Sequence, residues 1–252
     1  MSIRKFPKNP LLMGEMVERG SISQECASFL ELLVKAGYNI FISGGTGSGK
    51  TTFLNALSEF IPKSERVITI EDSAELQIHG VDNLVRLETR NAGAEGTLAI
   101  TIRDLIRTAL RMRPDRVVVG EIRGAECLDM LQAMNTGHDG SLSTGHANSC
   151  RDMVSRMETM VLMGMELPLA AIRSQIAAGV DILVHLGRLR DKSRRMLSMM
   201  EIDGIEHGEI RLNPLYQFME MGERNGVIMG RWEKKGELVH KGKLYAAGMQ
   251  PA

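Results

Sequence analysis

One stretch of this sequence has the residue types and spacing of a phosphate-binding loop. GGTGSGKT, residues 44–51, fits the pattern GxxxxGK[ST], in which glycines let backbone N–H groups turn inward around phosphate oxygens. Lys50 then places a positive charge at the β- and γ-phosphates, and the Thr51 hydroxyl is a ligand for Mg²⁺. A glycine-rich turn that only caps a helix is the alternative, but this match follows a strand pattern and opens a helix whose N-terminus points at the anion. The predicted phosphate-binding residues are Gly44, Gly45, Thr46, Gly47, Ser48, Gly49, Lys50 and Thr51.

Acidic and imidazole side chains end three further expected strands. RVITIE ends in Glu71, RVVVGE in Glu121 and SLSTGH in His146. Because ligands of open α/β sheets bind beyond the carboxyl ends of the strands, we expect these three side chains to converge on the terminal phosphate. A carboxylate there can hold Mg²⁺ or its waters, or orient an attacking water, and a histidine can neutralise charge on the γ-phosphate. Asp72 and Glu75 compete with Glu71 for its role.

Several arginines are candidates for phosphate contacts, within the chain or across a subunit boundary. Those at the ends of expected elements are Arg86, Arg90, Arg113 and Arg123. Arg103, Arg107 and Arg111 are spaced by four on one helix, which we interpret as a solvated face. The basic segment RLRDKSRR, residues 188–195, is interpreted as an exposed hairpin tip, with a nucleic-acid or lipid patch as the alternative.

The remaining pattern predicts the elements that must position these residues. We expect a capping box at Ser21 and Gln24 to begin a helix that Gly37 ends, and Thr101 with Asp104 to begin another. Strands and helices alternate up to about residue 180, and short strands with charged, glycine-rich turns follow. This order predicts an α/β fold with a mostly parallel central sheet flanked by helices and antiparallel C-terminal strands. The expected strands are 38–43, 66–71, 83–88, 116–121 and 141–146, and the expected helices are 50–60, 101–113, 125–136, 151–163 and 168–179.

Composition narrows the class of protein. The 252 residues carry 31 Lys+Arg and 31 Asp+Glu, so the net charge is zero, which argues against a long-range field for holding nucleic acid or acidic lipid. The 3 cysteines are far apart, so neither a disulfide framework nor a four-cysteine zinc site is expected, and a reducing cytoplasm is the natural compartment. No apolar run approaches the roughly 18 residues of a membrane helix. These features predict a soluble protein.

Taken together, the motifs resemble a known family. GGTGSGKTT, ITIEDSAEL, VRLETR, VVVGEIRG and TGHDGSLSTGH are similar to the secretion ATPases of type II and type IV systems, and most of all to the CpaF/TadA-type assembly ATPases of tight-adherence pili. The resemblance places the Walker A motif at 44–52, the Asp box at 68–76, an atypical Walker B motif at 117–121 and the His box at 136–146.

What the resemblance implies is a RecA-like motor domain that uses ATP and Mg²⁺ and works in a hexameric ring. Glu121 would be the catalytic carboxylate, Glu71 would act near Mg²⁺ through water, and His146 would contact the γ-phosphate, while Thr52 and Arg123 join the nucleotide-binding residues. Gly120 precedes Glu121 where a metal-binding Asp is usual, so metal ligation would rest more on Thr51 and water-mediated acids.

The same resemblance suggests how the chain is divided. Family members carry an N-terminal domain that closes over the nucleotide, and only SIRKF, residues 2–6, looks like its end. We therefore expect residues 1–20 to be a remnant of that domain with a linker, and residues 21–252 to form the ATPase domain. Arg4 is then a candidate nucleotide contact.

The resulting functional hypothesis is an ATP-hydrolysing motor. It would act in the cytoplasm at the inner membrane, where the ring passes its motion to a membrane platform protein that adds pilin to a fibre, without direct contact with nucleic acid. One alternative is a conjugation-type or other nucleic-acid-linked transfer ATPase, although the chain has few aromatic residues and no excess positive charge to line a channel. The other is a nucleotide-binding module that does not hydrolyse ATP.

Overall fold

A nine-stranded sheet forms the centre of the computed structural model, which describes residues 10–93 and 98–250. Within that described part the strand order is β3-β2-β4-β5-β1-β6-β7-β8-β9, and the six strands from β3 to β6 pair in parallel while β6 to β9 pair antiparallel. The strands are β1 Ile40–Gly44, β2 Arg66–Glu71, β3 Asn83–Glu88, β4 Arg116–Val119, β5 Leu142–Gly145, β6 Ile182–Arg188, β7 Arg194–Glu206, β8 Glu209–Arg224 and β9 Val227–Lys234.

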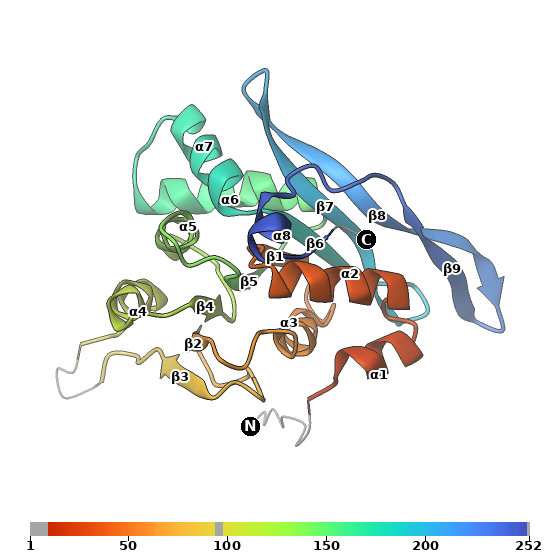
Figure 1. Ribbon diagram of the computed structural model, residues 1–252, viewed down its shortest axis with the longest axis horizontal. Coiled ribbons are helices and arrows are strands. Elements are labelled where there is room, and N and C mark those ends of the chain that lie inside the picture. Colours follow the sequence, from red (N-terminus) through yellow and green to blue (C-terminus); the bar gives the residue numbers. More distant parts are fainter. Residues whose placement is uncertain (1–9, 94–97, 251–252) are drawn as a thin grey trace.

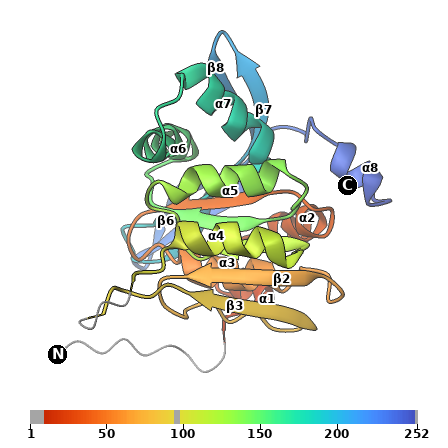
Figure 2. The same cartoon turned by 90° about the vertical axis from the view of Figure 1, so that its left-hand side faces the viewer.

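Helices cover both faces of the parallel strands. Figure 1 shows α1, α2 and α3 on one side of these strands and α4 to α7 on the other, and in Figure 2 α4 and α5 run across the front of the sheet. β1 alternates between the two layers, because Ile40 and Ile42 join the core under α2 and α3 while Phe41 joins the core under α5 and α6. The helices are α1 Met13–Glu18, α2 Gln24–Lys35, α3 Lys50–Ser58, α4 Ile102–Ala109, α5 Glu126–Asn135, α6 Cys150–Gly164, α7 Leu169–Gly179 and α8 Gly242–Ala246.

This architecture confirms the predicted fold class. The expected strands 66–71 and 83–88 match β2 and β3 at both ends, and the expected start signal at Thr101 and Asp104 forms a capping box at the beginning of α4. Among the described helices, none is both long and apolar enough to cross a membrane. All three cysteines of the chain, Cys26, Cys127 and Cys150, are reduced and buried.

The predicted start of the first long helix was wrong by two residues. Ser23 is the N-cap of α2, because its hydroxyl accepts a 3.2 Å hydrogen bond from the backbone N–H of Cys26. Ser21 belongs instead to the turn before it, where its N–H bonds the Met16 carbonyl and its own carbonyl accepts the N–H of Met196 from β7. This contact with a distant strand is not visible in the local pattern. The predicted left-handed end at Gly37 is confirmed, with φ +81°.

Helix α1 and the stripe of arginines also differ from expectation. The segment before residue 20 contains α1, whose Met13 and Met16 are buried in the same core as α2 and α3. The strand-like SIRKF segment with Arg4 lies outside the described residues, and the domain boundary at residue 20 remains a prediction. Two arginines of the stripe, Arg103 and Arg107, are not merely solvated, because both bind the buried Asp129 of α5 at 2.8 and 2.7 Å.

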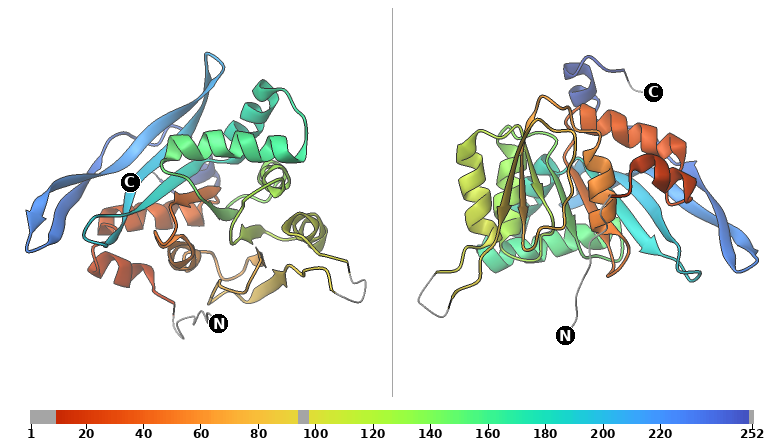
Figure 3. Two further views of the ribbon diagram at one scale, coloured as in Figure 1. Left: turned by 180° about the vertical axis from the view of Figure 1, so that it is seen from behind. Right: turned by 90° about the horizontal axis from the view of Figure 1, so that it is seen from below.

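The C-terminal strands extend the sheet well beyond the helical layers. Figure 3 shows β8 and β9 projecting past α1 and α2, and the short α8 lying beside α2 near the C-terminus. α8 is held there because Lys243 donates to the Gly37 carbonyl at 3.2 Å and pairs with Asp181 at 2.7 Å. The expected series of short strands is therefore a continuation of the same sheet.

A buried arginine joins the layers at the amino ends of the parallel strands. Arg116, the first residue of β4, is 2% exposed. Its guanidinium binds the Glu65 carboxylate through two nitrogens and donates to the carbonyls of Val34, at 2.7 Å, and Gly140, at 3.3 Å. Arg116 thus connects the end of α2 with the loops that precede β2 and β5.

We predict that Arg116→Ala lowers the free energy of unfolding by about 3–5 kcal/mol, because it leaves a carboxylate and two carbonyls without their cation. Urea unfolding at pH 7 measures the loss. The control is Arg111→Ala, which removes the same charge from an exposed position of the 3₁₀ turn after α4. Equal stability of the two variants would contradict this role of Arg116.

Candidate functional site

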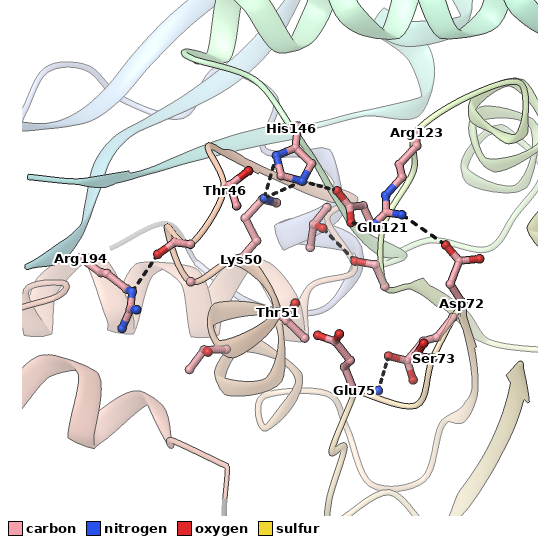
Figure 4. Close-up of a pocket in the computed structure, with 16 residues that line it drawn as sticks. Thr46, Lys50, Thr51, Asp72, Ser73, Glu75, Glu121, Arg123, His146 and Arg194 are labelled. Atoms are coloured by element: carbon pink, nitrogen blue, oxygen red, sulfur yellow. Dashed lines mark hydrogen bonds and ion pairs between the residues drawn. The ribbon is translucent and has the colours of Figure 1, made fainter. Parts of the chain in front are cut away.

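The site is a cavity of about 520 Å³ at the carboxyl ends of the parallel strands. The loop after β1 forms its floor, the end of β2 and the segments after β4 and β5 form its far wall, and the start of β7 closes it. Figure 4 shows side chains from these separate parts of the sequence, among them Lys50, Glu121 and His146, pointing into the cavity. Their meeting follows from the parallel pairing of the strands, which directs their carboxyl ends to one edge.

The loop after β1 has the backbone of a phosphate cradle. Gly47 and Gly49 have φ of +72° and +96°, a left-handed conformation that glycine adopts at little cost, and α3 begins at Lys50. The Lys50 ammonium is largely buried and donates to the carbonyls of Gly44, at 3.1 Å, and Gly45, at 3.3 Å. Burial lowers the pKa of Lys50, whereas nearby Glu121 raises it. The loop therefore holds a cation at the N-terminus of a helix, where an anion binds well.

Glu121 and His146 lie against each other beside Lys50. Their side chains meet with Nε2 of His146 2.7 Å from Oε1 of Glu121, and Nζ of Lys50 lies 3.4 Å from Nδ1 of the same ring. Arg123 binds the other carboxylate oxygen of Glu121 at 2.5 Å and approaches Asp72 at 3.7 Å. Burial, and then the charge of Lys50, lower the pKa of His146, so its ring is neutral at pH 7 and can donate one hydrogen bond.

Glu71 lies next to Gly120, the residue that precedes Glu121. It is 5% exposed and accepts backbone N–H groups of Glu75, at 3.0 Å, and Leu76, at 2.8 Å. A Cβ atom built on Gly120 would lie 3.1 Å from Cγ of Glu71, so a side chain at position 120 would displace this carboxyl group. Burial raises the pKa of Glu71 to about 7, although the two backbone N–H groups oppose that shift. An acid from β2 thus stands where β4 supplies none.

The structure brings most of the sequence-predicted residues to this one cavity. Glu71, Glu121, His146 and Arg123 all line it, as do the competing acids Asp72 and Glu75. Thr46, Gly47, Gly49, Lys50, Thr51 and Thr52 line it as well, whereas Gly44, Gly45 and Ser48 of the same loop do not. The roles assigned to these residues remain predictions.

Three of the predicted arginines lie away from the cavity of their own chain. Arg86 donates to the Ile78 carbonyl and Arg90 to that of Leu98, both at 3.3 Å. Arg113 ends the 3₁₀ turn with φ +52°, before β4 begins and thus at the opposite edge of the sheet. None of the three lines the cavity, so they do not contact a nucleotide bound in their own chain. Contact with a nucleotide bound to a neighbouring subunit stays a prediction.

Sequence reasoning missed Arg194 and Thr144 among the residues of the cavity. Arg194 comes from the segment that was interpreted as an exposed hairpin tip, and that segment does form the turn between β6 and β7. Its Nε donates to the Gly47 carbonyl at 2.8 Å, so the side chain turns back onto the phosphate loop. The density of basic residues at 188–195 was the signal, but the sequence does not tell which of them faces the loop.

The oxygen donors of the cavity fit Mg²⁺. Thr51, Glu71, Asp72 and Glu121 supply hydroxyl and carboxylate oxygens, the ligands that this hard cation prefers. In the described part of the chain, no three His, Cys, Asp or Glu side chains form a cluster that could hold a metal by themselves. Mg²⁺ would thus take most of its ligands from phosphate oxygens and water, as it commonly does with nucleotides.

Comparison with known proteins gives a consistent picture. The family described as type II/IV secretion system protein matches residues 1–221. The chain is 43% identical over 184 residues to a Mycobacterium tuberculosis protein whose name refers to conjugal transfer, covering 73% of this chain and 52% of that one. It is 39% identical over 182 residues to the type IV secretion system protein PtlH of Bordetella pertussis, covering 70% of this chain and 54% of PtlH. The chain thus spans about half the length of these curated relatives.

A solved structure is similar in fold and in sequence. The VirB11 ATPase from the Brucella suis type IV secretion system, crystallised in complex with sulphate, superimposes with a TM-score of 0.64 at 33% identity. The match covers 77% of this chain and 57% of that one.

The raised pKa of Glu71 makes stability depend on pH. The folded protein keeps a proton on Glu71 up to a pH of about 7, whereas the unfolded chain releases that proton near pH 4.5. The protonated carboxyl group therefore favours the folded state at low pH, and this contribution to stability is lost as the pH rises from about 5 to 8. We predict that the free energy of unfolding of Glu71→Gln, taken relative to that of the wild type, rises by up to about 3 kcal/mol when the pH is raised from 5 to 8.

Urea unfolding at both pH values, without nucleotide or Mg²⁺, measures this difference. Asp82→Asn is the control, because it removes an exposed carboxyl group just before β3 that does not contribute to the raised pKa of Glu71. If the difference between Glu71→Gln and wild type is the same at the two pH values, Glu71 does not take up a proton in this range.

Proposed function

The chain belongs to the family of type II/IV secretion system proteins, and on this premise we propose that it is the ATP-hydrolysing motor domain of such a system. The observation that supports this function best is the meeting of Lys50, Glu121 and His146 within 3.4 Å contacts over a phosphate loop. A cation for the phosphates and a carboxylate for water are what phosphoryl transfer to water requires.

In this proposal the site works mainly by positioning and electrostatics. Lys50 exchanges the loop carbonyls for the β- and γ-phosphate oxygens, and the backbone N–H groups of residues 46–51 hold the same phosphates. Glu121, whose carboxylate is held by Arg123, orients the attacking water and accepts its proton. The neutral His146 has a single N–H, so to donate a hydrogen bond to the terminal phosphate it would withdraw that N–H from the Glu121 carboxylate.

The metal would be held by Thr51 and, through water, by Glu71. Mg²⁺, when bound, neutralises charge on the phosphate oxygens. Glu71 must then release the proton that burial favours, since only the ionised carboxylate orders metal-bound waters well. Thr46 and Thr52, next to the loop, complete the contacts with the nucleotide.

For the whole protein we propose a hexameric ring in the cytoplasm at the inner membrane. ATP hydrolysis would change the angle between the domains of each subunit, and the ring would pass that motion to a membrane platform protein. The motif resemblance favours a tight-adherence pilus as the system served. Residues 21–252 would form the motor domain and residues 1–20 the link to an upstream domain. Arg4, Arg86, Arg90 and Arg113 are then the arginines with which a neighbouring subunit could reach the nucleotide.

A conjugation-type transfer ATPase is the second candidate, because a relative that is 43% identical is named for conjugal transfer. The zero net charge of the chain does not favour direct contact with DNA. Stimulation of ATP hydrolysis by single-stranded DNA that falls steeply with salt would favour this second function over the pilus motor.

We predict that Glu121→Gln binds ATP with wild-type affinity but hydrolyses it at least about 100-fold more slowly, because the water loses its base. Lys50→Ala is predicted to lose ATP binding, because the phosphates lose their buried cation. Calorimetric titration and phosphate release measure the two effects. If Glu121→Gln hydrolyses ATP as fast as an active wild type, Glu71 is the base instead. If the wild type binds ATP but does not hydrolyse it, the protein is a module that only binds nucleotide.

A ring should form when nucleotide is bound. We predict that a non-hydrolysable ATP analogue with Mg²⁺ shifts the mass in solution towards six times the 27.8 kDa chain, and that Lys50→Ala prevents the shift. Sedimentation velocity with and without the analogue measures it. The same mass in both conditions would contradict ring formation by this length of chain.

A further inference from the structure

Arg194 is the residue of the cavity that the proposed mechanism leaves without a role. It is the first residue of β7, 147 positions after Gly47, to whose carbonyl its Nε donates at 2.8 Å. In Figure 4, Lys50 lies between Arg194 on one side and Glu121 with Arg123 on the other. Arg194 therefore faces the phosphate loop from the side opposite to the proposed water-activating carboxylate.

The charge of Arg194 has no carboxylate partner in the described part of the chain. Arg123, the other arginine of the cavity, is paired with Glu121 at 2.5 Å and with Asp72 at 3.7 Å. Among the described residues, Arg194 makes its one hydrogen bond to a neutral carbonyl and forms no ion pair. A guanidinium beside the buried ammonium of Lys50, with its terminal nitrogens unpaired, is suited to an anion with two adjacent oxygens, such as a phosphate.

The turn that carries Arg194 is fixed in place. Asp191 accepts the N–H and the hydroxyl of Ser193, at 2.9 and 2.6 Å, and also the N–H of Ile228 in β9, at 2.9 Å. These hydrogen bonds lower the pKa of Asp191 to about 2, so the turn keeps its acceptor throughout the physiological range. Arg195 donates to the Ile228 carbonyl at 2.6 Å. The backbone of Arg194 is thus held in place before any ligand arrives, so only its side chain has to be ordered on binding.

The phosphate loop is shaped to accept this side chain. A Cβ atom built on Gly49 would lie 3.3 Å from Cδ of Arg194, so the glycine leaves the room in which the arginine lies. Arg194 also lines a second cavity of about 270 Å³, which shares Gly49 and Thr52 with the first. Part of its lining is apolar, from residues such as Phe53 and Leu186, and part is basic, from Arg19, Lys192 and Arg195. The apolar part suits the nucleoside and the basic part suits the phosphate next to it, whereas the terminal phosphate belongs at Glu121 and His146.

We propose that Arg194 binds the phosphate group nearest the ribose, with its guanidinium moving from the Gly47 carbonyl to two oxygens of that phosphate. This inference rests on the nucleotide site proposed above and adds a residue from the same chain to it. Because that phosphate is present in both diphosphate and triphosphate, Arg194 contributes equally to the affinity for ADP and for ATP and little to the rate of hydrolysis.

The test is calorimetric titration of the wild type, Arg194→Gln and Arg190→Gln with ADP and with a non-hydrolysable ATP analogue. Arg194→Gln should weaken both affinities by about tenfold, the scale of a charge-assisted hydrogen bond, and keep their ratio within about twofold. Arg190→Gln is the matched control, because it removes the same charge from the same turn, where Arg190 pairs with Glu220 and Glu223 outside both cavities.

Two results would overturn the proposal: unchanged affinity for both nucleotides, or a loss confined to the triphosphate analogue. If Arg194→Gln fails to fold, Arg194→Lys replaces it, because lysine keeps the charge but lacks the two parallel N–H donors of the guanidinium. This variant should lose about threefold in affinity for both nucleotides. Wild-type affinities would again overturn the proposal. A wild type that binds no nucleotide would instead refute the nucleotide site itself. Binding lost in Lys50→Ala but unchanged in Arg194→Gln would refute the role of Arg194 alone.

Discussion

Parallel pairing of β1, β2, β4 and β5 is the constraint on which the rest of this structure depends. Because these strands run in one direction, the chain must return to the same edge of the sheet after each of them. The phosphate loop and the segments that carry Glu121 and His146 therefore meet although about 100 residues separate the first from the last. Reversal of any one strand would send its terminal side chain to the far edge, where Arg116 joins the layers.

Cations and acids alternate across the cavity rather than forming one charged surface. Lys50 lies between the carbonyls of its own loop and the Glu121–His146 pair, and Arg123 separates Glu121 from Asp72. Glu71 stands apart, buried and close to Gly120. The net charge of the chain is zero, yet the cavity offers two cations, Lys50 and Arg194, to a polyphosphate.

The sequence predicted those features that depend on neighbours along the chain. The glycines and Lys50 of the loop, the bounds of β2 and β3, and the cap at Thr101 follow from local spacing, and the shared edge follows from counting parallel strands. Features that depend on distant packing were missed. Ser23 rather than Ser21 caps α2 because β7 occupies the turn, and Arg194 reaches Gly47 from 147 residues away. The packing of Glu71 against Gly120 likewise joins two distant parts of the chain and does not follow from local spacing.

The burial of all three cysteines has a practical consequence for labelling this protein with thiol reagents. Burial raises the pKa of Cys26 and of Cys150 to about 11 and raises that of Cys127 as well, so none forms the reactive thiolate readily near neutral pH. A thiol-specific fluorophore would thus react far faster with a cysteine introduced on the surface than with the native ones. A fluorescent label can therefore be attached at a chosen surface position without first replacing Cys26, Cys127 or Cys150.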